Sequence, residues 1–369
     1  MNLLPEPREY DPFFSPLFLP VHRWRFSCRF PRALQLPMRE GATPGTLLTG
    51  CFRSLLLAKE CRESPLHGSN DWQELSSVVA GDRDLGGSCA KGEFLCRHPD
   101  DCACGALHRL RCSWQPGRIL PPVVQLSAPR LWEPEPMRDW ELVVTLLGRK
   151  AYLHHEAVVS LIAAFGHTGI RISREMVPFS TQLTEPQESG LVGGELFLGQ
   201  EKARHMANEL PIPDEPKRLL TAFYTPLLLK PTQENDQKTG GSRRLLAREK
   251  ELDLPKLLGN MAFDLCALDC EDRGVLAPPI TIRRAMCEAA RAFVQEAAEE
   301  ITVLTNHMSP VDMGLRESRT GNGTFSLGGL TGYVVMKCPP PVVPWIRAMS
   351  HWRAGQLGSK GFGEVQVWG

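Results

Sequence analysis

HRWRFSCRF, residues 22–30, alternates large apolar side chains with basic ones. Because successive side chains of an extended chain point to opposite faces, this period of two predicts a half-buried β-strand. Its buried face would carry Trp24, Phe26, Cys28 and Phe30, and its outer face Arg23, Arg25 and Arg29. The stretch therefore indicates a sheet with one apolar side and one basic side.

A helix, a strand, a second helix and a last strand are predicted beyond this first strand. Thr43 can cap and Pro44 can open a helix whose apolar residues recur at helical spacing: Leu47, Leu48, Cys51, Phe52, Leu55 and Leu56. WELVVTLLG, residues 140–148, reads as a strand, and HHEAVVSLIAAFG, residues 154–166, as a helix closed by Gly166. A last strand is expected within EMVPFSTQLT, residues 175–184.

The second half repeats this order with one extra helix. Strands are predicted within residues 218–230, where Pro226 interrupts the pattern, and within 301–308, 328–338 and 362–368. Helices are predicted within residues 253–269, 283–300 and 339–352. Each half thus approximates β-α-β-β-α-β, the order of a ferredoxin-like domain. The predicted fold class is α+β, with two tandem ferredoxin-like (RRM-like) domains.

The length and the turn-rich segments set the expected domain boundaries. A chain of 369 residues exceeds one usual core. We expect an N-terminal domain over residues 1–182, with a cysteine-rich insertion at about 62–112, and a C-terminal domain over residues 217–369 that ends in a glycine-rich loop and strand. Residues 183–216 are rich in proline, glycine and charge, so they are expected to form a linker or excursion.

The composition excludes a protein that binds nucleic acid through its overall charge. Lysine and arginine total 42 and are balanced by 42 acidic residues, so a surface for a polyanion must be a local patch. No run approaches the roughly 18 to 20 apolar residues of a membrane span, and the start MNLLPEPREYDPFF has no basic region leading into an apolar core. We expect a cytoplasmic protein without a membrane partner.

Five of the twelve cysteines lie in one polar segment, residues 89–112. Four of them, with His98 and His108 as alternates, are predicted to bind a structural zinc ion: Cys96, Cys102, Cys104 and Cys112. Thiolates so close together suit tetrahedral zinc, which would replace a missing hydrophobic core. The spacing is not a paired C-x-x-C, and an unmetallated cysteine-rich loop is the alternative.

Several motifs resemble those of a known family. FYTPLLLK at 223–230, FSLGGLTGYVVMK at 325–337 and GQLGSKGFGEVQV at 355–367 are similar to the CRISPR-associated endoribonucleases of the RAMP superfamily that process precursor crRNA. GATPGTLLTGCFRSLLLAKEC at 41–61 and CACGALHRLRC at 102–112 resemble a subgroup with an N-terminal cysteine cluster. The resemblance implies binding of CRISPR repeat RNA and its cleavage without a catalytic metal.

The resemblance also implies an RNA-binding loop near the C-terminus. The predicted contacts are Arg353, Gly355, Gly358, Lys360, Gly361 and Gly363. Backbone amides of such a loop can approach RNA phosphates, and Lys360 adds a point charge. The loop is shorter than the family's usual form, and a glycine turn into the last strand is the alternative interpretation.

The implied chemistry is attack of a ribose 2'-hydroxyl on the adjacent phosphate, which requires groups that accept and donate protons. The family commonly places a histidine in or before the first helix, and residues 41–61 contain none. His22 and His307 are the predicted catalytic candidates, because a histidine can play either part near neutral pH. A site of arginine and lysine without histidine is the alternative.

Three functions follow as hypotheses. The first is a repeat-specific endoribonuclease that retains its crRNA and joins other CRISPR effector subunits. The second is a cleavage-inactive RAMP subunit that binds crRNA within such a complex. The third is a zinc-stabilised protein-binding scaffold, against which the basic strand face and the glycine loop argue.

Overall fold

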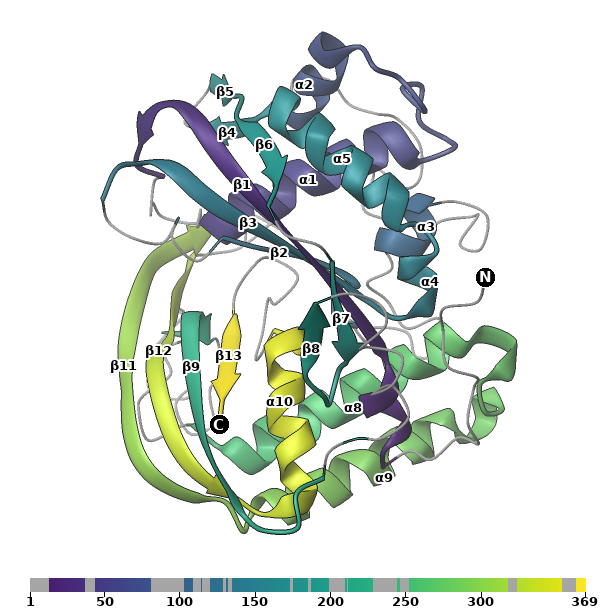
Figure 1. Ribbon diagram of the computed structural model, residues 1–369, viewed down its shortest axis with the longest axis vertical. Coiled ribbons are helices and arrows are strands. Elements are labelled where there is room, and N and C mark those ends of the chain that lie inside the picture. Colours follow the sequence, from purple (N-terminus) through teal and green to yellow (C-terminus); the bar gives the residue numbers. More distant parts are fainter. Residues whose placement is uncertain are drawn as a thin grey trace.

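A computed structural model describes residues 13–36, 44–80, 103–108, 114, 120–128, 131, 135–172, 175–184, 187–198, 210, 212–227, 244–245, 252–317, 324–353 and 363–369. The fold is mixed α+β and contains two large, mainly antiparallel sheets, one in each half of the chain (Figure 1). Helices cover one face of each sheet, so each half buries an apolar core on that face.

The first sheet has the strand order β2-β3-β1-β7-β8, with β6 also paired to β1. Its strands are β1 (Pro20–Leu34), β2 (Val124–Ser127), β3 (Met137–Leu147), β6 (Ser180–Leu183), β7 (Glu188–Leu191) and β8 (Leu196–Leu198). The helices are α1 (Pro44–Glu60), α2 (Trp72–Ala80), α3 (Ala103–His108), α4 (Arg149–Tyr152) and α5 (His155–Thr168). The strand at residues 22–30 is confirmed as part of β1.

The alternating pattern of β1 predicts its two faces correctly. Trp24, Phe26, Cys28 and Phe30 are each at most 5% exposed. They lie in the same core as the inward side of α1 and α5, where the rings of Phe52 and Phe165 pack edge to face. The arginines between them therefore point to the opposite face of the sheet.

One expectation in this half is corrected, and two gain detail. Gly166 lies inside α5, and the helix ends at Gly169, whose φ of 84° suits a glycine. The last strand expected within 175–184 is confirmed as β6, which pairs with β1. A short strand β5 (Glu175–Val177) precedes it and pairs with β4 (Ile170–Ile172) outside the main sheet. The segment 183–216 is not only a connection, because β7 pairs directly with β1 and β8 with β7.

The second sheet has the strand order β10-β12-β9-β13, with β11 also paired to β12. Its strands are β9 (Lys217–Leu227), β10 (Arg244–Leu245), β11 (Thr302–Glu317), β12 (Thr324–Cys338) and β13 (Val365–Trp368). Helices α8 (Leu254–Arg273), α9 (Ile280–Ala298) and α10 (Val343–Trp352) lie on one side of it (Figure 1). Apart from the two-residue strand β10 between β9 and α8, the order β-α-α-β-β-α-β confirms the predicted sequence of elements, extra helix included.

A side chain of the second half caps a helix of the first half. The carboxylate of Asp272, on α8, accepts hydrogen bonds from the backbone N–H groups of Arg149 and Lys150 at 3.0 and 2.9 Å. It also pairs with the Arg149 guanidinium at 3.3 Å. An acidic side chain at a helix N-terminus satisfies donors that have no partner within the helix, so the first turn of α4 depends on a residue of the second half.

Among the described helices, none is both long and apolar enough to cross a membrane. The described residues also contain no group of three or more side chains placed to hold a metal ion. Of the four predicted zinc ligands, Cys104 is buried in α3, whereas Cys96, Cys102 and Cys112 lie outside the described residues. The structural zinc ion therefore stays a prediction.

Candidate nucleic-acid interface

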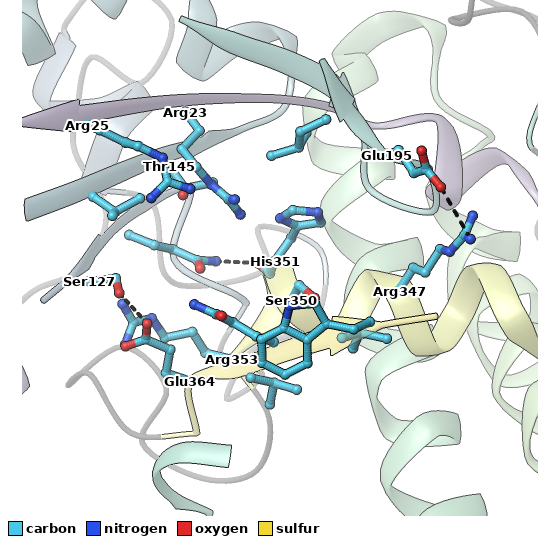
Figure 2. A pocket seen from close by; sticks show the side chains of 18 of the residues that line it. Arg23, Arg25, Ser127, Thr145, Glu195, Arg347, Ser350, His351, Arg353 and Glu364 are labelled. Atoms are coloured by element: carbon cyan, nitrogen blue, oxygen red, sulfur yellow. Dashed lines mark hydrogen bonds and ion pairs between the residues drawn. The ribbon is translucent and has the colours of Figure 1, made fainter. Parts of the chain in front are cut away.

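A cleft of about 520 Å³ lies between the open face of the first sheet and the C-terminal end of α10 with the edge strand β13 (Figure 2). Residues of both halves line it, and its charged members are Arg23, Arg25, Glu141, Glu195, Arg347, Arg353 and Glu364. The first sheet supplies one wall because the period of two in β1 directs its arginines away from the helix-covered core.

The wall from the first sheet carries Arg23 and Arg25. Arg25 lies 3.0 Å from a carboxylate oxygen of Glu141 on β3, the strand next to β1. Arg23 lies 3.6 Å from Glu188 on β7, the neighbour on the other side. Cross-strand pairing thus holds both guanidinium groups toward the cleft, as Figure 2 shows.

The opposite wall comes from α10. Arg347 and His351 are four residues apart, so they lie on the same side of the helix and both reach the cleft. Arg347 pairs at 3.4 Å with Glu195, which lies just before β8. The carboxylate of Glu195 belongs to the first half, so this ion pair spans the cleft (Figure 2).

His351 is an uncharged polar group in the cleft. It is 4% exposed, and burial together with the nearby Arg23 guanidinium lowers its pKa to about 3. Its backbone carbonyl accepts a hydrogen bond of 2.5 Å from the side chain of Gln125. Its Nδ1 has no hydrogen-bond partner within the described part of the chain. At neutral pH this buried imidazole therefore adds no charge to the cleft.

Arg353 follows α10 directly and joins the two halves. It has a φ of 62°, the one positive φ at a described non-glycine residue. Its side chain is almost fully buried, where it donates to the Leu126 carbonyl of β2 and lies 3.9 Å from Glu364. Glu364 in turn accepts a hydrogen bond from Ser127. The sequence predicts Arg353 as an RNA contact, and the structure places it in the cleft wall with its donors directed at protein groups.

The ion pairs of the cleft differ in how readily a phosphate could replace the carboxylate. The side chains of Glu141 and Glu195 are 45% and 58% exposed. Solvent-exposed ion pairs contribute only ~0–1 kcal/mol, so exchanging either carboxylate for an anionic ligand costs little. The Arg353–Glu364 pair is buried, and removing one partner would leave an uncompensated charge. Arg25 also lies 3.7 Å from the less exposed Glu188, so a phosphate would replace only its contact with Glu141. With that contact and the Arg347–Glu195 pair open to exchange, Arg25 and Arg347 are the cations best placed to bind a phosphate.

His22 is held on the far side of β1 from the cleft arginines. It is 8% exposed and its ring stacks on Tyr152 with centroids 3.8 Å apart. Its Nδ1 lies 3.0 Å from the Ser189 hydroxyl and 2.7 Å from Nε2 of Gln187. Burial, with a smaller contribution from His155, lowers the pKa of His22 to about 4.

His307 lies in the other half, on β11, so the structure does not bring the two predicted catalytic histidines together. Its side chain is exposed, and its ring centroid is 4.8 Å from that of Tyr333 on β12. The two residues are direct cross-strand partners.

Most of the predicted glycine-rich loop lies outside the described residues, namely Gly355, Gly358, Lys360 and Gly361. Gly363 is described, and its φ of 68° belongs to the left-handed region that favours glycine. The next residue, Glu364, donates its backbone N–H to Thr225 on β9 at 2.8 Å. The RNA contacts of the loop and the glycine turn that is the alternative interpretation both stay predictions.

Sequence reasoning missed Arg347, His351 and the carboxylates that pair with the cleft arginines. The i, i+4 spacing of Arg347 and His351 within an otherwise apolar helix is a signal that could have indicated a polar side. Glu195 and Glu364 carry no such local signal, because each gains its role from a partner far away in the sequence. The basic outer face of β1, by contrast, is visible in the residues themselves.

The structural neighbours of this chain are Cas6 and RAMP proteins, at low sequence identity. A Cas6 protein of Thermus thermophilus is 12% identical, covers 95% of this chain and 98% of its own, and has a TM-score of 0.40. A RAMP protein that binds different RNA substrates is 10% identical over 95% of this chain and 100% of its own, with a TM-score of 0.38. The product of a Cas6-related gene from Pyrococcus furiosus is 10% identical over 94% and 98%, with a TM-score of 0.37.

A scan of protein-family models and a search of curated proteins give no match to the chain.

Proposed function

We propose that this chain binds CRISPR repeat RNA in the cleft between its halves and cleaves precursor crRNA without a catalytic metal. The observation that carries the proposal is the pair of arginine-bearing walls, with Arg25 on one side and Arg347 on the other, each paired to an exposed carboxylate. A phosphodiester backbone can replace both carboxylates at once, so both halves would contact the same RNA.

The fold is consistent with this proposal. In the first half the strands that correspond to the β-α-β-β-α-β order lie side by side as β2-β3-β1-β6, and in the second half as β11-β12-β9-β13. The same spatial order in both halves supports two ferredoxin-like domains in tandem. We place the cysteine-rich segment, with its predicted structural zinc, as an insertion in the first of them.

The proposed cleavage requires only a proton acceptor and a proton donor, and protein side chains can supply both. The ribose 2'-oxygen would attack the adjacent phosphorus and lose its proton to a base, while the bond to the 5'-oxygen breaks and that oxygen gains a proton. The products are a 2',3'-cyclic phosphate and a 5'-hydroxyl. His307 is the better of the two predicted proton-transfer groups, because it is exposed whereas His22 is buried.

The test is incubation of the purified protein with labelled cognate repeat RNA in EDTA. We expect a product with a cyclic phosphate end, and no cleavage of a substrate with a 2'-deoxy sugar at the cut position, which should still bind. Alanine at His307 should lower the single-turnover rate about 100-fold or more while the affinity is kept. Cleavage of the deoxy substrate would contradict the proposed attack.

A second function is favoured by the burial of His22 and His351. With pKa values of about 4 and about 3, both are neutral and enclosed by protein at physiological pH. A RAMP subunit that binds crRNA without cutting it would need neither as a proton carrier. In the assay above, such a subunit would bind the repeat RNA tightly and leave it intact.

The remaining expectations are part of the same proposal. A protein that keeps hold of crRNA would act in the cytoplasm and could join other CRISPR effector subunits. Co-purification of crRNA with the intact chain, followed by sequencing of the bound RNA, would test this directly. Recovery of RNA without repeat sequence would contradict it.

A further inference from the structure

The open face of the second sheet presents aromatic rings to solvent. Tyr224 on β9 is 43% exposed, Tyr333 on β12 is 39% exposed and Trp368 on β13 is 44% exposed. Aromatic side chains are usually among the better buried residues. Three exposed aromatic residues on three neighbouring strands therefore indicate a binding surface.

Strand register places the rings on one face. Tyr333 pairs with Ala222, Ala222 pairs with Gln366, and Trp368 pairs with Leu220. Residues two apart on a strand share a face, so Tyr224 lies on the same side as Ala222, and Trp368 on the same side as Gln366. The alternate residues Thr221 and Phe223 are buried on the side that the helices cover. The rings of Tyr224 and Trp368 approach each other edge to face at 6.3 Å.

The charges around the rings favour an anionic partner. Lys337 and Arg218 are cross-strand partners on this face. The open-face positions around the rings, at residues 218, 220, 222, 224, 302, 305, 307, 309, 331, 333, 335, 337, 366 and 368, include no aspartate or glutamate. A surface of rings and cations without carboxylates suits nucleic acid better than an apolar protein face.

The same face is continuous with the cleft. Gln366 and Trp368 lie on β13, the edge strand that forms part of the cleft lining beside Arg347 and His351. An RNA strand leaving the cleft along this edge would therefore meet Trp368 first and then Tyr224, without crossing any helix.

We propose that the open face of the second sheet binds single-stranded RNA by stacking bases on Tyr224, Tyr333 and Trp368, while Lys337 and Arg218 contact phosphates. A four-stranded antiparallel sheet with aromatic residues on adjacent strands is a surface on which unpaired bases can stack and be held. The inference rests on the proposed RNA-binding function and extends it: the cleft holds one part of the RNA, and the sheet holds the unpaired nucleotides beside it.

The test uses a single-stranded RNA 12-mer with 2-aminopurine at its centre and no repeat sequence. The parent protein should quench the 2-aminopurine fluorescence and bind the 12-mer. Each of Tyr224→Ala and Tyr333→Ala should weaken binding by about 5-fold to 150-fold, the range expected for loss of one stacked base. The slope of log affinity against log salt should not change, because a tyrosine contacts no phosphate.

Two kinds of control separate the loss of base stacking from a general effect of the substitution on the fold or the surface. Tyr224→Phe and Tyr333→Phe keep the stacking surface and should bind within about 2-fold of the parent. Ile280→Ala, at a 62% exposed apolar residue on α9, removes exposed apolar surface on the helix side and should have no effect. Lys337→Ala should weaken binding and lower the salt slope by about 0.7.

The outcomes distinguish this inference from the proposed function. Ring-dependent binding of the 12-mer without tight binding of repeat RNA would support the sheet surface and contradict the repeat-specific function. Binding of the 12-mer that is equal in the parent and the alanine variants would overturn the sheet surface and leave the cleft proposal standing. Failure to bind the 12-mer, or ring-dependent association with protein alone, would overturn the inference.

Discussion

At the scale of single side chains, Arg353 supports the structure more than it could support RNA binding. Its guanidinium is buried between the Leu126 carbonyl and Glu364. Arg353→Ala should leave the Glu364 carboxylate unpaired and lower the free energy of unfolding by about 3 kcal/mol or more, as for other broken buried pairs. Urea unfolding would measure this. A variant with the stability of the parent but weaker RNA binding would restore the RNA-contact interpretation.

His22 makes the stability of the folded chain depend on pH. Its pKa is lowered to about 4 in the fold, whereas the same group in the unfolded chain titrates near 6.5. The unfolded state therefore binds the proton first, so this contribution is complete above about pH 6.5 and is lost as the pH falls to about 4. The shift corresponds to ~3 kcal/mol.

The substitution His22→Gln tests this dependence, because it removes the titrating ring and keeps a polar group near Ser189. Urea unfolding at a series of pH values should show a flatter fall in stability between about pH 6.5 and pH 4 in the variant. Parallel curves for parent and variant would contradict the assignment to His22.

At the scale of elements, two helical glycines should respond oppositely to alanine. Intrinsic propensity favours alanine over glycine by up to about 1 kcal/mol in a helix interior. Gly50 in α1 is exposed, and a Cβ there meets nothing within 4 Å, so Gly50→Ala should raise the free energy of unfolding. At Gly166 in α5 a Cβ would lie 2.6 Å from the Phe179 carbonyl oxygen, so Gly166→Ala should lower it by about 1–3 kcal/mol.

Urea unfolding of the two variants gives the comparison directly, since each serves as the control for the other. Stabilisation by both substitutions would mean that the chain entering β6 does not pack against α5 as closely as the structure has it.

The same contrast explains which elements could be predicted from the sequence. The two faces of β1 and the inward side of α1 follow from local periodicity, and both are confirmed. Gly166 was expected to end a helix because glycine is common there, yet it allows close packing with residues 13 positions later. The pairing of β7 with β1 joins residues more than 160 apart, and no local pattern in 183–216 indicates it.

At the scale of the whole molecule, the cleft exists only because the two halves are docked. The Gln125 side chain binds the His351 carbonyl, and Asp272 caps a helix of the first half. The basic face of β1 could be predicted from the sequence as half of a binding surface. The opposite wall of the cleft could not be predicted from the sequence, because Arg347 contributes to it only after α10 has been placed against the first sheet.

The central claim is that RNA phosphates occupy the cleft between the arginines of the two walls. The most direct test is the affinity for labelled repeat RNA, measured over a series of salt concentrations, of the parent and of Arg25→Gln/Arg347→Gln. Glutamine keeps a polar side chain at both positions and removes both charges.

We predict weaker binding by the double variant and a salt slope lower by about 1.4, which corresponds to two lost phosphate contacts on single-stranded RNA. Equal affinity and equal slope for the two proteins, with both folded, would contradict the claim that the cleft holds the RNA.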